Sequence, residues 1–374
     1  MKHQERGRTD LRKWDRYIGI PAVAALSLVT PKKKVPPRVS SIGLIALGAI
    51  GDTILCVGPA VPVLRQAFPN ASITLFTSRA NSGIAPLLPP CDQLTILPIS
   101  DPLRCVRLLR RQKQDILIDF TAWPRIGALL SRLSGAKYTL GFETRGQHRH
   151  FAFDATVKHS DQIHEFENYV NLLGVLGVER PSWPRVKPSE AARSKLRSEH
   201  FRRYIVFHPW ASGFKKEMRE WPIGHWQQLA EALVRLDFDV VFTGGPADAE
   251  KSAELVTGIN ASPGRIIDAA GKYSIDETAA LLEASSGVVS VNTGIMHLAA
   301  ALDLPIVALH GPTNPVRWGP LSNRARSISP KGGKTAFLNL GFEYPEDFES
   351  CMHLLSVEEV LTCLREQLEF RQTA

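Results

Sequence analysis

The sequence predicts an α/β protein with two Rossmann-like domains and a cleft between them. With 374 residues, the chain is too long for one ordinary core and suits two domains of similar size. Its 44% hydrophobic and 22% charged residues are normal for a globular protein. Short apolar runs alternate with helix-like stretches, and the pattern restarts near residue 204, as expected of two parallel sheets with crossover helices.

In the first half, an apolar run at Ser41–Leu47 predicts the first strand, and a Gly-rich loop and a helix to Phe68 follow it. Further strands are expected at Ser72–Thr77, Leu94–Leu97 and Asp115–Phe120. The stretch Thr139–Ser160 breaks this alternation and is rich in Arg, Lys and His, so we expect a basic loop there.

In the second half, strands are expected at Tyr204–His208 and Asp239–Thr243, and a capping box at Ser274–Glu277 opens a later helix. The predicted domains are a leader (1–40), an N-terminal Rossmann-like domain (41–180), a linker (181–200), a C-terminal Rossmann-like domain (201–350) and a C-terminal helix (351–374).

The leader holds most of the positive charge of the chain. Residues 1–40 contain ten Lys and Arg against three acids, out of a net charge of +8, so the body is nearly neutral and a poor candidate for binding nucleic acid. As a helix, the uncharged run Ile18–Val29 would reach only ~18 Å, short of the ~30 Å hydrocarbon core. We therefore expect residues 1–38 to lie on an anionic membrane surface, with a cleaved signal peptide and an unbound basic leader as alternatives.

The five cysteines are scattered and include no C-x-x-C pair. This pattern is typical of reduced thiols in a cytoplasmic protein and predicts neither a disulfide framework nor a zinc site.

A phosphate-binding turn is expected within Val288–Pro320, which reads as strand, polar turn, Ala-rich helix and strand. Thr293 is placed to cap the helix, and Gly294 would allow a ligand close to the backbone. The N–H groups of Ile295, Met296 and His297 would then point outward with the helix dipole and cradle a diphosphate. The His297 ring would add a further donor.

Two other segments each follow the first strand of one half of the chain. Each is therefore expected at the carboxyl edge of its own parallel sheet, where ligands bind. Asp52 follows the loop at Gly48–Gly51, where the helix dipole would lower its pKa and let it accept a proton from a hydroxyl; a plain helix cap is the alternative. In the loop after Tyr204–His208, Lys215, Lys216 and Arg219 could neutralise a diphosphate, or could simply be solvated. The glycine loop lacks the full dinucleotide fingerprint, so no nicotinamide cofactor is expected.

These motifs together resemble the heptosyltransferases of lipopolysaccharide core synthesis, glycosyltransferase family 9. The resemblance runs from about Ser41 to Leu368. Its marks, in order, are Leu47-Gly-Ala-Ile-Gly-Asp52, Arg219-Glu-Trp-Pro222, Thr243-Gly-Gly-Pro246, Asn292-Thr-Gly-Ile-Met-His297, His310-Gly-Pro-Thr-Asn-Pro and Arg317-Trp-Gly-Pro320. It implies a GT-B fold and a nucleotide-sugar donor, ADP-heptose in typical members, held by the C-terminal half. It also implies inversion at the anomeric carbon without a metal or other cofactor.

The resemblance assigns roles to individual residues. Asp52 matches the catalytic aspartate of the family, and Arg219 stands in place of its phosphate-contacting Lys. Thr293, Gly294 and His297 match the diphosphate-binding turn of the family. The full set of expected donor-binding residues is Ser212, Lys216, Arg219, Gly245, Asn292, Thr293, Gly294, Met296 and His297. Apart from the resemblance, Arg145 and Arg149 of the basic stretch are expected to bind phosphates of the acceptor. Asn292 is a departure, because the family usually has Asp there.

The predicted function is an inverting, metal-independent transfer of a sugar to a lipopolysaccharide-core or other lipid-linked acceptor. The expected partners are a nucleotide-sugar, a lipid-linked glycan and an anionic membrane surface, with no nucleic acid. The chain would then be a peripheral protein on the cytoplasmic face of the inner membrane. A sugar-nucleotide epimerase or hydrolase, or a non-catalytic sugar-nucleotide binder, are the alternatives.

Overall fold

The computed structural model describes residues 17, 19–21, 32–199 and 201–373. These residues form two compact units that divide between Pro184 and Arg185. Most of the leader lies outside the described residues, so its attachment to a membrane stays a prediction. Within the described ranges, no helix is long and apolar enough to cross a membrane.

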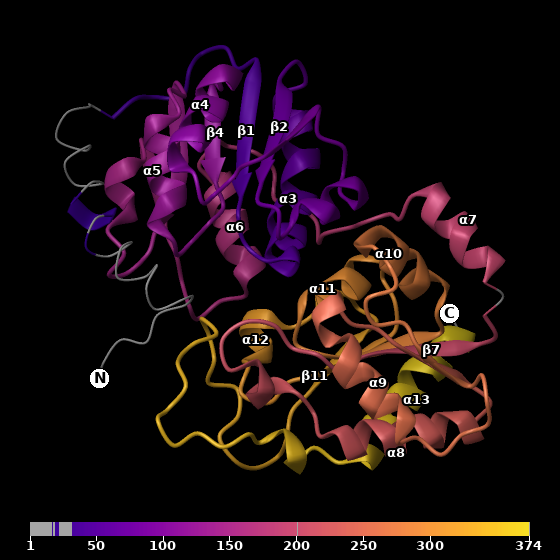
Figure 1. Ribbon diagram of the computed structural model, residues 1–374. Helices are drawn as coiled ribbons and strands as arrows, with labels where there is room; N and C mark the ends of the chain where they lie inside the picture. The colour runs from indigo at the N-terminus through magenta and orange to yellow at the C-terminus, as the bar shows by residue number, and fades with distance from the viewer. Residues whose placement is uncertain (1–16, 18, 22–31, 200, 374) are drawn as a thin grey trace. The chain divides into compact units, whose positions relative to one another are not determined.

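The N-terminal unit is a six-stranded parallel sheet in the order β3-β2-β1-β4-β5-β6, with helices packed against it (Figure 1). Its strands are β1 (Ser41–Ala46), β2 (Ser72–Thr77), β3 (Gln93–Ile96), β4 (Ile116–Asp119), β5 (Tyr138–Glu143) and β6 (Ala155–Lys158). Its helices are α3 (Ile50–Ala67), α4 (Pro102–Gln112), α5 (Arg125–Leu133) and α6 (Glu165–Gly174), with 3₁₀ turns at Ser82–Leu87 and Arg149–Ala152. The central strands β1 and β4 are buried almost throughout, because helices cover both faces of a parallel sheet.

The expectation of a basic loop at Thr139–Ser160 was wrong. Strands β5 and β6 occupy the two ends of this stretch, and of its basic residues only Arg145, His148, Arg149 and His150 lie in the segment between them. Gly141 in β5 faces the ring of Phe153, and a Cβ atom at this glycine would collide with that ring. Polar Thr139 and Glu143 also interrupt β5, whereas β1 is apolar from Ile42 to Ala46 and is easier to recognise.

The C-terminal unit repeats this design with the strand order β12-β11-β10-β7-β8-β9, again all parallel. Its strands are β7 (Tyr204–His208), β8 (Asp239–Phe242), β9 (Ile266–Asp268), β10 (Gly287–Val291), β11 (Ile306–Leu309) and β12 (Ala325–Ile328). Its helices are α7 (Glu190–Ser198), α8 (Ile223–Arg235), α9 (Ala249–Thr257), α10 (Ile275–Ala284), α11 (Gly294–Ala301), α12 (Pro315–Trp318) and α13 (Val357–Thr373), with 3₁₀ turns at Lys216–Arg219, Pro246–Asp248 and Met352–Leu354.

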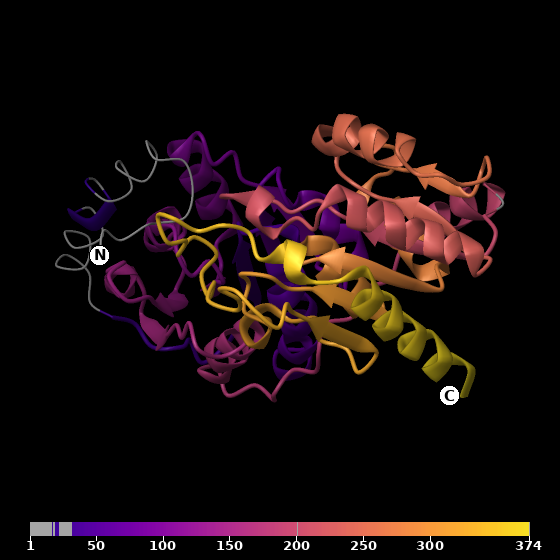
Figure 2. The ribbon, with the colours of Figure 1, turned by 90° about the horizontal axis from the view of Figure 1, so that it is seen from below.

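Two predicted boundaries change. The expected linker at residues 181–200 holds α7, which belongs to the C-terminal unit: Ser189 at its start hydrogen-bonds Asp276, and Arg193 pairs with Glu283 at 2.6 Å. The expected separate helix at residues 351–374 is part of the same unit. Val360, Leu364 and Leu368 of α13 are buried in its main core, and Figure 2 shows α13 running beside the strands of this sheet.

Both sheets have a point at which the strand order reverses. In the N-terminal unit it lies between β1 and β4, and in the C-terminal unit between β7 and β10. The loops that leave neighbouring strands there turn to opposite faces of the sheet and leave a crevice at its carboxyl edge. Asp52 follows β1, and the turn at Asn292–Gly294 follows β10, so both candidate sites stand at such points. The prediction of an α/β fold with two Rossmann-like units is confirmed.

Candidate functional site

The turn after β10 has the expected cap. Thr293 is the N-cap of α11, and its hydroxyl accepts a hydrogen bond from the Ile295 N–H at 3.2 Å. Asn292, Thr293, Gly294 and Ile295 are all partly exposed. Because Thr293 takes the Ile295 N–H, the expectation that this group is free for a ligand was wrong. The helix start still combines a positive dipole end with an accessible backbone.

The next two residues turn inward. Met296 has no exposed surface, so neither its side chain nor its backbone is open to a ligand in this structure. His297 keeps 6% of its surface, so its ring is not the open donor that the sequence suggested. The apolar Leu298–Ala301 stretch that completes α11 is buried as well, which fixes the turn on the core of the unit.

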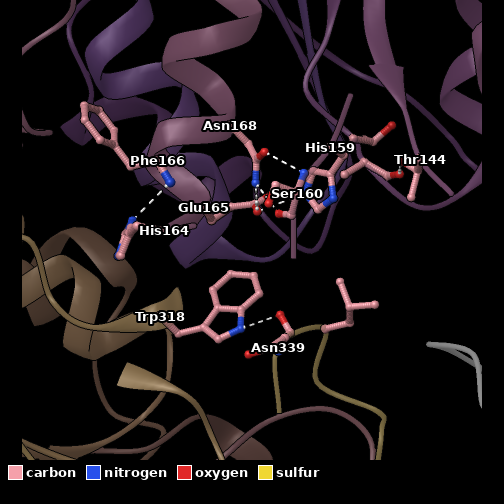
Figure 3. Close-up of polar contacts among 12 residues, drawn as sticks. Thr144, His159, Ser160, His164, Glu165, Phe166, Asn168, Trp318 and Asn339 are labelled. Atoms are coloured by element: carbon pink, nitrogen blue, oxygen red, sulfur yellow. Dashed lines mark hydrogen bonds and ion pairs between the residues drawn. The ribbon is translucent and has the colours of Figure 1, made fainter. Parts of the chain in front are cut away.

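Asn292 joins the turn to a second loop of the C-terminal unit. Its side-chain amide donates to the Trp318 carbonyl at 3.0 Å and lies 3.8 Å from the Met296 sulfur. The Trp318 indole N–H in turn donates to the Asn339 carbonyl at 2.9 Å (Figure 3). A carboxylate at position 292 could not donate to Trp318, so the amide that departs from the family pattern performs a contact of its own.

The loop after β7 is held by its own arginine. Arg219 donates to the backbone carbonyl of Ser212, which closes the segment between them. The Lys216 ammonium lies 3.8 Å from the Asp248 carboxylate and is a little over one third exposed. Asp248 also accepts from the Gly245 N–H at 3.0 Å, so this amide, expected to serve a donor, is already bonded. Lys216 therefore remains open to an anion, while the Gly245 amide is committed to a helix cap.

A segment that the sequence did not single out supports this loop from below. The Tyr344 hydroxyl donates to the Lys215 carbonyl at 3.4 Å, and the Ser350 hydroxyl donates to the Met218 carbonyl at 3.1 Å. Burial raises the pKa of Tyr344 to about 12, although Arg219 opposes this shift, so the phenol stays a donor at neutral pH. The aromatic run around Tyr344 was the available signal in the sequence.

Two histidines at the ends of β7 and β11 are kept neutral. Burial lowers the pKa of His208 to about 4 and that of His310 to about 3. His208 lies 3.0 Å from the Thr243 hydroxyl, and His310 lies 3.2 Å from the Thr313 hydroxyl. Both rings therefore brace the carboxyl edge of the sheet as uncharged hydrogen-bonding groups.

In the N-terminal unit, Asp52 lies in the first turn of α3 and is partly exposed. Its carboxylate accepts from the Ala49 N–H at 3.2 Å, which is the helix-cap role weighed from the sequence. A Cβ atom at Gly48 would lie 2.9 Å from the Asp52 carboxylate, so the glycine lets the loop fold closely over the acid. A capping carboxylate that remains partly exposed can also accept a proton.

The two arginines expected to bind the acceptor differ sharply. Arg145 is exposed, but Arg149 is completely buried and forms a 2.6 Å ion pair with Asp119 at the end of β4. Arg149 also donates to the backbone carbonyl of Thr121 and to the Thr121 hydroxyl, the latter at 3.0 Å. Its expected place in an exposed basic loop was wrong, because the guanidinium links the turn at residues 149–152 to the central sheet.

A second buried polar cluster lies after β6. The His159 ring is 3.0 Å from the Glu165 carboxylate, and the Asn168 amide donates to Glu165 at 3.1 Å and to the Ser160 carbonyl at 2.8 Å (Figure 3). These bonds fix the start of α6 to the end of β6. Across the described ranges, no group of three or more His, Cys, Asp or Glu side chains is placed to hold a metal ion.

A family model described as glycosyltransferase family 9 (heptosyltransferase) matches residues 103–338, more than half of the chain. The chain belongs to this family. A lipopolysaccharide heptosyltransferase 2 of Salmonella typhimurium is 34% identical over 175 residues, which cover 43% of this chain and 50% of the relative. The chain thus matches about half the length of that curated relative.

Solved structures agree on the fold. An ADP-heptose lipopolysaccharide heptosyltransferase II of Escherichia coli has a TM-score of 0.73 at 23% identity, covering 89% of this chain and 100% of that one. A family 9 glycosyltransferase of Veillonella parvula has a TM-score of 0.76 at 22% identity, covering 90% and 99%. The GT-B fold that the motifs implied is confirmed.

Proposed function

We propose that this chain is an inverting glycosyltransferase that moves a heptose from ADP-heptose to a hydroxyl of a lipid-linked acceptor of the lipopolysaccharide-core type. The observation that carries the proposal is the pairing of two features within a family 9 chain. A partly exposed carboxylate, Asp52, stands at the switch point of one sheet, and an accessible helix start, Thr293–Ile295, stands at the switch point of the other.

In the proposed reaction, Asp52 takes the proton of the acceptor hydroxyl while its oxygen attacks the anomeric carbon. The bond from that carbon to the diphosphate oxygen breaks on the opposite side, which inverts the configuration. The departing ADP carries both electrons of this bond. Its growing negative charge is met by the start of α11 and by the cations Lys216 and Arg219.

Metal independence is part of the proposal. In enzymes that use a divalent cation, the metal neutralises the leaving diphosphate. In this proposal the dipole of α11 and the side chains of Lys216 and Arg219 neutralise it instead. We expect turnover to be unchanged by EDTA and by added Mg²⁺. Loss of activity on chelation, restored by metal, would contradict this part.

The decisive experiment replaces Asp52 by Asn in the full chain. The amide oxygen of Asn can still accept from the Ala49 N–H, but the side chain can no longer take up a proton at neutral pH. We expect kcat to fall about 10²- to 10⁴-fold with little change in thermal stability. Glu277→Gln is the matched control, because Glu277 is the capping-box residue at the same helix position in α10.

The outcomes separate the competing functions. If Asp52→Asn turns over as fast as wild type, Asp52 is only a helix cap. If ADP-heptose is consumed at the same rate with and without acceptor, the chain is a hydrolase or epimerase. If the donor binds but is transferred to no lipid extract, the chain is a binder.

We further propose that the chain works at the cytoplasmic face of the inner membrane, attached through residues 1–38. Seven of the eight net positive charges lie in the leader, and a lipid-linked acceptor would be found at this surface. Deleting residues 1–31 should reduce flotation with anionic vesicles. Unchanged flotation would contradict attachment by the leader.

A further inference from the structure

The exposed face of α4 is the most strongly basic surface that the described residues form on a single helix. Arg104, Arg107, Arg110, Arg111 and the following Lys113 are all exposed. Cys105 and Leu109 lie on the opposite face and are buried in the core against the sheet. The helix is thus attached to the N-terminal unit by a narrow apolar stripe and presents its cations outward.

These cations make few contacts that would stabilise the N-terminal unit. Arg110 donates to the Leu133 carbonyl at 2.8 Å, which ties α4 to α5. For Arg104, Arg107 and Arg111, no ion pair with a carboxylate is found among the described residues. The three share one stripe, because their spacing of three and four residues places them one turn apart. Such a row of like charges does not stabilise the folded unit, because the charges repel one another. The row therefore suggests an anionic partner.

The described end of the leader lies beside the same surface. The Lys33 backbone N–H donates to Asp154 at 3.0 Å, and its ammonium donates to the Ala136 carbonyl at 3.0 Å. Ala136 is three residues from Leu133, which receives Arg110. Lys32, Lys33 and Lys34 are all exposed. The leader therefore joins the folded unit near the end of α5 that Arg110 of α4 also contacts.

The other end of α4 carries an apolar side chain. Leu103 is 71% exposed and lies in the first turn of the helix. Because α4 follows β3, this turn is at the carboxyl edge of the sheet, the edge that also carries Asp52. Figure 1 shows α4 beside α5 in this unit. The surface thus combines a cationic stripe with one exposed apolar residue at the edge where the acceptor is proposed to react.

We propose that the outer face of α4 is a docking surface for an anionic phospholipid bilayer, with Arg104, Arg107 and Arg111 on the headgroup phosphates and Leu103 at the headgroup boundary. Guanidinium groups bind phosphate oxygens in pairs, and an interfacial apolar residue adds to such contacts. The inference rests on the proposed attachment to the membrane, and it adds a second, folded contact to the leader. This contact would hold the Asp52 edge of the unit near lipid-linked acceptors.

The test uses the full chain with Arg104, Arg107 and Arg111 all changed to Gln, which keeps the helix propensity and leaves Arg110 in place. Each cation near an anionic surface contributes roughly fivefold to binding. We therefore expect flotation with phosphatidylglycerol vesicles to weaken at least about tenfold, and wild-type binding to fall in high salt. The matched control changes Arg235, Lys272 and Arg365, three exposed cations of the C-terminal unit, to Gln, and should bind as wild type.

The proposal is overturned if the α4 variant binds no more weakly than the control, or if wild type binds neutral phosphatidylcholine vesicles equally well. Turnover of a water-soluble, delipidated acceptor separates this result from failure of the proposed function. The α4 variant should keep wild-type kcat and KM in that assay. A raised KM for the soluble acceptor with unchanged vesicle binding would assign the arginines to the acceptor and overturn the membrane role.

Discussion

Replacing Arg149 by Met tests whether this arginine is structural. The side chain has no exposed surface, pairs with Asp119 at 2.6 Å and donates to Thr121 twice. Removing one partner of a buried ion pair leaves the other charge uncompensated, at a cost of about 3–5 kcal/mol. We therefore expect Arg149→Met to lower the free energy of unfolding of the N-terminal unit by about 3 kcal/mol, measured by urea unfolding of the full chain.

The pH dependence gives this prediction a sign. Burial raises the pKa of Asp119, while Arg149 and Thr121 act to lower it, so loss of Arg149 should raise this pKa further. A carboxyl whose pKa is higher in the folded than in the unfolded state favours folding at low pH and loses that contribution as pH rises through the folded pKa. The cost of Arg149→Met should therefore be smaller at pH 5 than at about pH 8.

The control is Arg145→Met in the same turn region, because Arg145 is exposed. Its free energy of unfolding should change by less than about 0.5 kcal/mol. In the double variant Asp119→Asn with Arg149→Met, part of the lost stability should return, since no buried charge remains. Wild-type stability in Arg149→Met, together with a raised KM for the acceptor, would refute this reasoning and restore Arg149 to acceptor binding.

Two further substitutions test local packing. Asn292→Asp should lower kcat/KM at least about tenfold, because a carboxylate would face the Trp318 carbonyl in place of the 3.0 Å hydrogen bond; Asn292→Gln at full activity, or Asn292→Asp at wild-type rate, would contradict this. Gly141→Ala should cost about 1–3 kcal/mol in thermal or urea unfolding, because its Cβ would meet the Phe153 ring. Gly174→Ala in α6 is its control and should not destabilise, since nothing lies within 4 Å of that Cβ position.

Local pattern was enough to predict the fold class and the main turns. Buried runs such as Ser41–Ala46 read as parallel strands without tertiary information, since both faces of such a strand are covered. The cap at Thr293 and the capping box at Ser274 were also predictable, because these bonds join residues two or three apart. The family motifs predicted the GT-B fold in the same way, because each motif is a short segment of consecutive residues that can be recognised without tertiary information.

Contacts between distant residues could not be read in this way. Strands β5 and β6 were hidden by Gly141 and by the charged turn between them, and their place depends on the pairing of β5 with β4 and of β6 with β5. Helix α7 looked like a linker, and only its bonds to Asp276 and Glu283 place it in the C-terminal unit. Tyr344 reaches the loop at Lys215 from more than a hundred residues away.

The sequence by itself determined the two-domain α/β design, the switch-point loops and the position of Asp52 and Thr293 at strand ends, because each depends on periodicity and on bonds between near neighbours. Only the tertiary structure decided which charges are exposed. Arg149 and Arg145 are four residues apart and look alike in the sequence, yet one is paired inside the unit and the other faces solvent. The physical reason is that burial of a charge depends on a partner such as Asp119, which the chain supplies thirty residues away.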